Sequence, residues 1–157
     1  KTSVLLELGA RLSPGPVPYA LVDLDWLAWV RPAEASGVTV QAALRENLTH
    51  VARTYRDAGV ERVVLARAVR TREELSDISE ALAGSRLTVV RLVASAEVVE
   101  QRLRGRDSGT ELAEHLEEAA AFAAEAEAAG IGDAVIDCSE LAVPEVAARV
   151  LAAAGWT

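Results

Sequence analysis

The chain has 157 residues, 51% of them apolar and 25% charged, with a formal net charge of -8. This length and apolar content are typical of a single domain with one buried core. An acidic chain repels polyanions, and no arginine-rich tract with interleaved aromatic residues is present, so we expect no nucleic-acid partner. The single Cys138 cannot form an internal disulfide. Since neither a signal-peptide pattern nor a long apolar run occurs, we expect a soluble cytoplasmic protein that binds no membrane.

Apolar residues at helical spacing predict an opening helix over 2–13, which the stretch SPGPVP ends. After it, short apolar runs predict strands, and amphipathic segments with capping and glycine stop signals predict helices. The strands are expected at 19–25, 60–69, 86–94 and 133–138, and the helices at 38–59, 71–84, 95–105, 108–130 and 143–155. This alternation predicts an α/β fold in three layers, with a mostly parallel sheet between two layers of helices.

The predicted order begins with a helix, whereas a doubly wound domain begins with a strand in the middle of its sheet. Omitting a central strand leaves several backbone N–H and C=O groups unpaired, at about 1–3 kcal/mol each. Several such groups together exceed a typical stability of roughly 5–15 kcal/mol. We therefore expect the first central strand to be missing from this sequence, so that residues before Lys1 supply it or another segment takes its place.

Lys1 is the only lysine of the chain, and it stands with Thr2 at the start of the first predicted helix. A phosphate-binding loop reads G-x-x-x-x-G-K-[ST] and joins a strand to the helix that follows. On its last two positions and this helix, the chain resembles the P-loop kinases of metabolites and nucleotides, such as the adenylate, shikimate, gluconate and adenylylsulfate kinases. The resemblance implies ATP and Mg²⁺ as cofactors, with Lys1 on the β- and γ-phosphates, Thr2 on magnesium and Ser3 in the ATP site. A chance Lys-Thr pair at a helix start is the alternative.

The stretch VDLDWLAW places Asp23 and Asp25 two apart at the end of a predicted strand. Alternate strand residues point to the same side, so both carboxylates could face one cleft. The pair resembles the position where shikimate-type kinases set one carboxylate near magnesium and another on the substrate hydroxyl. The resemblance implies that Asp23 binds the metal, that Asp25 binds the acceptor and that both are catalytic. The alternative is that they are turn aspartates that cap the next segment.

The stretch EQRLRGRDSG carries Arg102, Arg104 and Arg106 around a break between two predicted helices. It resembles the lid of these kinases, whose arginines close over ATP and neutralise charge on the transferred group. A guanidinium suits that role because its planar fork binds phosphate oxygens and stays charged. The resemblance implies catalytic roles for Arg102 and Arg106 and ATP binding for Arg102 and Arg104. The alternative is a solvated basic helix end.

The strand predicted at 60–69, which is the third in the family's order when the missing strand is counted, departs from the family pattern. It has neither an acidic residue within its apolar run nor a glycine-rich turn after it. Arg67 and Arg70 lie at the end of that strand and could bind an anionic group of the substrate, or they could be surface charges. Trp26 and Trp29 would share a helix face, as part of the core or of a pocket wall.

Together these features predict one P-loop kinase-like domain over residues 1–157, with a lid at about 101–110. The function that follows from the resemblance is in-line transfer of a phosphoryl group from ATP to a small metabolite or nucleotide. The alternatives are a kinase-like protein that binds nucleotide without turnover, and an α/β interaction domain that binds none. The sequence identifies neither the phosphate acceptor nor an oligomeric state.

Overall fold

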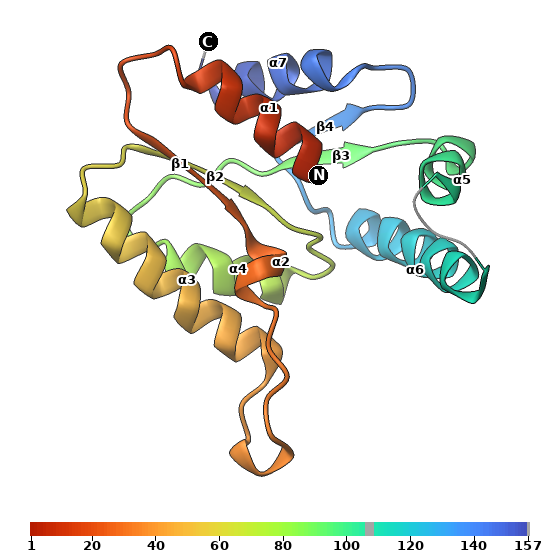
Figure 1. The fold of residues 1–157 in the computed structure, drawn as a ribbon, viewed down its shortest axis with the longest axis horizontal. Coiled ribbons are helices and arrows are strands. Elements are labelled where there is room, and N and C mark those ends of the chain that lie inside the picture. The colour runs from red at the N-terminus through yellow and green to blue at the C-terminus, as the bar shows by residue number, and fades with distance from the viewer. Residues whose placement is uncertain (106–108, 157) are drawn as a thin grey trace. The chain divides into compact units, whose positions relative to one another are not determined.

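The structure, a computed structural model, describes residues 1–105 and 109–156. Helices alternate with short strands along the chain, which confirms the α/β class (Figure 1). The chain divides into two compact units: unit 1 comprises Lys1–Arg67 and Glu73–Leu87, and unit 2 comprises Ala68–Arg72 and Thr88–Thr157. Each unit is described by itself, and the organisation of residues 1–157 as one domain stays a prediction.

Unit 1 is built on two parallel strands. In chain order its elements are α1 (Thr2–Leu12), β1 (Tyr19–Asp23), α2 (Leu24–Leu27), the 3-10 helix η1 (Glu34–Ser36), α3 (Val40–Asp57), β2 (Arg62–Ala66) and α4 (Arg72–Ala81). The register of the strands runs from Tyr19 opposite Arg62 to Asp23 opposite Ala66, so both strands end at the same edge. In Figure 1, α1 lies on one side of this pair and α3 and α4 lie on the other.

Helix α1 packs tightly on the strands because one face of it is apolar and one residue on that face has no side chain. Leu5, Leu8 and Leu12 are buried at helical spacing. Between them, a Cβ atom at Gly9 would overlap the side chain of Leu21 on β1. The Tyr19 hydroxyl donates a hydrogen bond to the Gly9 carbonyl oxygen at 3.1 Å. These contacts fix the position of the N-terminal end of α1 beside the strand ends.

Unit 2 repeats the plan with a second parallel pair. Its elements are β3 (Val90–Val93), α5 (Ala96–Arg104), α6 (Gly109–Ala128), β4 (Ala134–Asp137) and α7 (Val143–Ala154). Val90 lies opposite Ala134 and Val93 opposite Asp137. Figure 1 shows α7 on one side of this pair and α6 on the other. Ile136 of β4 and Val146 and Ala147 of α7 are among its buried residues.

The structure refines the sequence-based expectations in two places. The strands of the described chain form two parallel pairs, β1 with β2 and β3 with β4, where a single mostly parallel sheet was predicted. The predicted strand 19–25 is also too long, because the chain turns into α2 after Asp23. The helix starts follow their caps: the side chains of Thr39 and Ser95 accept hydrogen bonds from the first turns of α3 and α5. Ser108, the first residue of the helix predicted over 108–130, lies outside the described residues.

Within residues 1–105 and 109–156, every helix is too short or too polar to cross a lipid bilayer.

Candidate functional site

The first part of the site is the junction of β1 and α2, where both aspartates of the D-x-D stretch lie. Asp23 is the last residue of β1 and the N-cap of α2, and its Oδ1 accepts a hydrogen bond from the Asp25 backbone N at 3.1 Å. Asp25 belongs to the first turn of α2, so the expectation that both residues lie on one strand is wrong. The physical reason is the cap itself, because the carboxylate satisfies an N–H that the start of a helix leaves free.

The two N-terminal residues meet the two aspartates. The Thr2 hydroxyl donates a hydrogen bond to Asp23 Oδ2 at 2.8 Å, and Lys1 Nζ lies 3.1 Å from Asp25 Oδ2. The contacts join segments 21 and 24 residues apart in the sequence. The start of α1 therefore lies at the carboxyl ends of parallel strands, which is where ligands bind in open α/β sheets.

Arg67 follows β2 and completes the group. Its Nη1 lies 3.6 Å from Asp25 Oδ1, so Asp25 contacts a cation with each of its oxygens. The Arg67 side chain is only 15% exposed, and its Nε atom is buried without a hydrogen-bond partner. A buried guanidinium with a spare donor is suited to bind an anionic or carbonyl oxygen.

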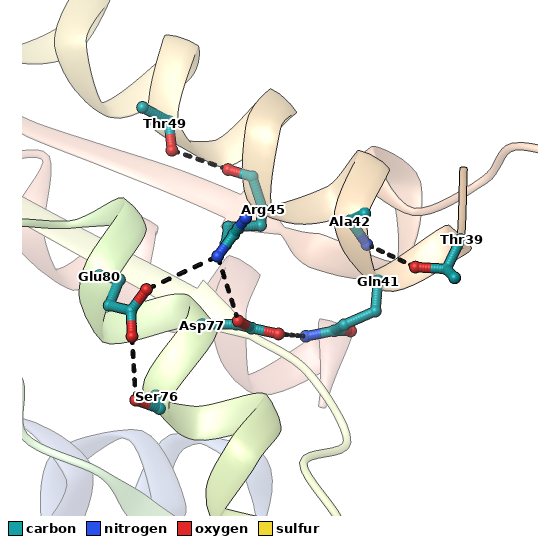
Figure 2. A network of polar contacts seen from close by, with 8 residues as sticks. All are labelled: Thr39, Gln41, Ala42, Arg45, Thr49, Ser76, Asp77 and Glu80. Atoms are coloured by element: carbon teal, nitrogen blue, oxygen red, sulfur yellow. Dashed lines mark hydrogen bonds and ion pairs between the residues drawn. The ribbon is translucent and has the colours of Figure 1, made fainter. Parts of the chain in front are cut away.

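A network of polar contacts extends from Arg67 to helices α3 and α4. Arg67 Nη2 lies 3.5 Å from Gln41 Oε1, and Gln41 Nε2 donates to Asp77 Oδ2 at 3.0 Å. Figure 2 shows the outer part of this network, where Arg45 lies between Asp77 and Glu80. Arg45 Nη1 is 3.8 Å from Asp77 Oδ1 and 3.6 Å from Glu80 Oε2.

The sequence analysis did not identify Gln41 or Asp77 as part of the site, although one signal was present. Gln41 lies three and seven residues before Leu44 and Leu48, which are almost completely buried. A polar residue on the same helix face as buried apolar residues needs a hydrogen-bond partner. The identity of that partner depends on the packing of α3 against α4, which the sequence does not give.

The start of α1 offers a site for phosphate. No side chain caps this helix, and no acidic residue lies in its first turn. Free N–H groups and the helix dipole at such an end attract anions, and the exposed Lys1 adds a positive charge. Ser3 is exposed in the same turn, and its expected contact with ATP stays a prediction.

The oxygen donors of Thr2 and Asp23 fit magnesium. Mg²⁺ in nucleotide sites keeps several waters and takes one or two carboxylates plus phosphate oxygens. The residues that the structure describes contain no group of three or more His, Cys, Asp or Glu that could hold a metal ion alone. The Thr2 hydroxyl and the Asp23 carboxylate would therefore hold magnesium only together with the phosphate oxygens of a bound nucleotide.

Arg70 belongs to unit 2 and lies among groups of α6. It contacts Glu118 Oε1 at 2.6 Å and Glu125 Oε2 at 3.2 Å, and its guanidinium carbon lies 5.5 Å from the Phe122 ring centroid. In the structure Arg70 contacts side chains of α6, and its role in substrate binding stays a prediction.

Two of the three lid arginines can be placed, and both lie on α5 in unit 2. Arg102 Nη2 donates to the Cys138 carbonyl oxygen at 2.8 Å, and Arg104 pairs with Glu100 one turn away. Arg106 lies outside the described residues. The assignment of 101–110 as a lid stays a prediction.

The carboxyl end of β4 carries a further polar group, which was not singled out from the sequence. Asp137 Oδ1 accepts hydrogen bonds from the Ser139 hydroxyl at 2.6 Å and the Ser139 backbone N at 2.8 Å. These bonds lower the pKa of Asp137. Next to it lies Cys138, and burial raises the pKa of its thiol.

The comparisons with known proteins give one informative likeness. No protein-family model matches the chain, and no curated protein matches it. Among solved structures, the chain is similar to the tunicamycin resistance protein of Deinococcus radiodurans, with a TM-score of 0.60 and 14% sequence identity. The match covers 98% of this chain and 90% of that one. A likeness at this identity concerns the fold alone.

Proposed function

We propose that the protein is an ATP-dependent kinase that transfers a phosphoryl group to a hydroxyl group of a small molecule. The observation that carries the proposal is the meeting of Lys1 and Thr2 with Asp25 and Asp23 at 3.1 and 2.8 Å. The Lys-Thr pair and the D-x-D pair resemble separate parts of one kinase site, and their contacts bring them into one cluster. The fold likeness is compatible with a phosphotransferase of this type.

Each residue of the cluster has a role in this proposal. Lys1 and the amides at the start of α1 bind the phosphates, and Arg67 binds an oxygen of the acceptor. Thr2 and Asp23 would hold Mg²⁺, which neutralises charge on the phosphates. Asp25 orients the acceptor hydroxyl and takes its proton as the new O–P bond forms and the bond to the leaving ADP oxygen breaks.

The ion pair between Lys1 and Asp25 is weak enough to exchange when nucleotide binds. The side chains of Lys1 and Asp25 are 44% and 53% exposed. An ion pair that is open to water contributes roughly 0–1 kcal/mol, so exchanging a carboxylate for phosphate oxygens costs little. The roles that the resemblance implies for Arg102, Arg104 and Arg106 stay predictions.

The end of β2 favours a second candidate function, which is nucleotide binding without turnover. That strand is followed by Arg67 and has no carboxylate of its own. A kinase-like regulatory protein would keep the phosphate site and lose the chemistry. An α/β interaction domain that binds no nucleotide is the third candidate.

Steady consumption of ATP by the purified protein, tested with a panel of hydroxylated molecules, separates these candidates. The name of the similar structure places tunicamycin first in the panel. The kinase proposal requires turnover that depends on one acceptor, with the phosphorylated product identified by mass spectrometry. Binding of ATP without turnover across the panel would support the regulatory protein.

The Lys1→Ala variant tests the assignment of the phosphate site. We expect its turnover to fall at least a hundredfold, while the Arg11→Ala control, which removes a cation from the other end of α1, keeps its activity. Circular dichroism and the melting temperature show whether both variants are folded. Turnover retained in a folded Lys1→Ala protein would refute the assignment.

A further inference from the structure

Large apolar side chains are exposed mainly in one segment of unit 1. The structure shows eight such residues among those it describes, and five of them lie between residues 26 and 40: Trp26, Trp29, Val30, Val38 and Val40. The two tryptophans are 66% and 77% exposed, so they are not part of the core, and the alternative of a pocket wall stays a prediction. Exposed apolar patches of this kind mark binding surfaces more often than chance positions do.

The two indoles form a pair. Their ring centroids lie 5.0 Å apart with the planes tilted by 36°. Paired indoles offer a broad, rigid apolar surface, on which flat rings and the C–H faces of sugars pack well. The Trp29 backbone N donates to the Trp26 carbonyl oxygen at 3.3 Å, which holds the two residues in one local turn.

The pair is held next to the proposed acceptor site. Trp26 directly follows Asp25 in α2, and the Asp23 carboxylate caps the same helix. From α3, Asn47 Nδ2 donates to the Leu27 carbonyl oxygen at 2.9 Å. Figure 1 shows the chain after α2 extending away from the helices of its unit before it returns to α3.

We propose that Trp26 and Trp29 form a stacking surface for the phosphate acceptor, which is an amphipathic molecule with a ring beside its reacting hydroxyl. The proposal rests on the assignment of Asp25 to that hydroxyl. It narrows the substrate class, because a small, fully polar metabolite would gain nothing from an exposed indole pair. A protein partner fits less well, since five side chains fall short of the roughly 20–30 residues per side of a stable interface.

Two glucosides that differ only in their apolar group test the proposal. Phenyl β-D-glucoside and methyl β-D-glucoside share the sugar ring and its hydroxyls, and the phenyl glucoside adds an aromatic ring that can stack on the indoles. The Trp156→Phe variant leaves Trp26 and Trp29 as the only indoles, so tryptophan fluorescence reports on the pair. We expect a saturable change with the phenyl glucoside and binding about tenfold weaker with the methyl glucoside.

Calorimetry on variants that keep Trp156 shows which residues bind the phenyl glucoside. Trp29→Ala and Asp25→Asn should each weaken binding of the phenyl glucoside about tenfold. Leu6→Ala, which removes another exposed apolar side chain (64% exposed) from α1, should leave binding unchanged. Equal affinity for the two glucosides, or an equal effect of Leu6→Ala and Trp29→Ala, would overturn the proposal.

Two further results would also overturn it. A fluorescence change with adenosine and none with the phenyl glucoside would assign the pair to the nucleotide base. Concentration-dependent dimerisation that Trp29→Ala abolishes would assign it to a second copy of the chain. Binding of Mg²⁺ and ATP, measured on the same proteins, separates these failures from failure of the kinase proposal. If the phenyl glucoside binds and ATP does not, the stacking surface stands and the nucleotide site is refuted. If ATP binds and the phenyl glucoside does not, the nucleotide site stands and the stacking surface is refuted.

Discussion

At the scale of residues, two strands end in aspartates that use their carboxylates differently. Asp23 at the end of β1 divides its oxygens between the Asp25 backbone N and the Thr2 hydroxyl. Asp137 at the end of β4 receives both of its described bonds from one residue, Ser139, at a single oxygen. In the first arrangement the carboxylate itself joins distant segments. In the second the carboxylate bonds only within its own turn, and the Ser139 hydroxyl joins that turn to the start of α5 by accepting a hydrogen bond from the Ser95 backbone N at 2.9 Å.

Replacing Ser139 with Ala should raise the pKa of Asp137 toward its ordinary value of 3.8. The Ser139 hydroxyl is the main cause that lowers this pKa, and the Ser139 backbone N–H, which the variant keeps, is the second. A lowered folded-state pKa contributes stability that is present above the unfolded-state pKa and is lost as the pH falls through the folded-state pKa. The variant should therefore lose less stability than the parent protein on acidification below about pH 4.

Carboxyl carbon chemical shifts, followed by NMR from pH 6 to pH 2 in isotope-labelled protein, check this prediction. The exposed Ser85 offers a matched control, and Ser85→Ala should leave the titration of Asp137 unchanged. An Asp137 titration that is the same in Ser139→Ala and the parent protein would show that the hydroxyl contributes nothing.

At the scale of elements, helix α3 contributes one polar side chain that contacts Arg67 of the candidate site. The face of α3 that buries Leu44 and Leu48 also carries Gln41, whose amide lies between Arg67 and Asp77. Arg67 in turn contacts Asp25 at the site. The position of the acceptor-binding groups thus depends on how α3 and α4 pack within unit 1.

Replacing Gln41 with Leu should lower the free energy of unfolding by about 1–3 kcal/mol, because a mostly buried guanidinium and a mostly buried carboxylate each lose a partner. The midpoint of urea denaturation measures the loss. Gln101, which is exposed on α5, provides the control, and its change to Leu should stay within about 0.5 kcal/mol. Equal losses in the two variants would mean that the contacts of Gln41 do not stabilise the fold.

At the scale of the whole molecule, the order of elements could be predicted because helices and strands differ in period and in their end signals. Thr39, Ser95 and the glycine after α7 mark helix ends in the sequence as they do in the structure. The pairing of strands could not be predicted, since continuous apolar runs such as β2 do not specify a neighbour. Helix α2 was missed because four residues are too few to show a period.

The candidate site was predictable in its residues and not in its contacts. Lys1, Thr2, Asp23 and Asp25 stand out by type and spacing, and they meet in the structure. The indole pair differs, because an apolar pair at helical spacing is expected to be buried, and only the fold shows that it is exposed. Exposed apolar residues at helical spacing are more informative about function than buried ones, because they depart from the usual rule that such residues pack in the core.

The last prediction separates a nucleotide-binding protein from an interaction domain without any knowledge of the acceptor. Ligand at a hundred times its dissociation constant stabilises a fold by about 2.7 kcal/mol. For a chain of this size each kcal/mol raises the melting temperature by roughly 2–4 °C, so saturating ATP with Mg²⁺ should raise it by roughly 5–10 °C. Differential scanning fluorimetry measures the shift.

Two variants on helix α1 assign the shift to the proposed site. Lys1→Ala should remove most of it, because the charge that faces the phosphates is lost, whereas Arg11→Ala at the other end of the helix should keep all of it. ATP without Mg²⁺ should give a smaller shift, because the Asp23 carboxylate, which would help to hold the cation, repels the phosphates when no cation is bound. A melting temperature that ATP leaves unchanged, with and without Mg²⁺, would favour the interaction domain and remove the basis for the kinase.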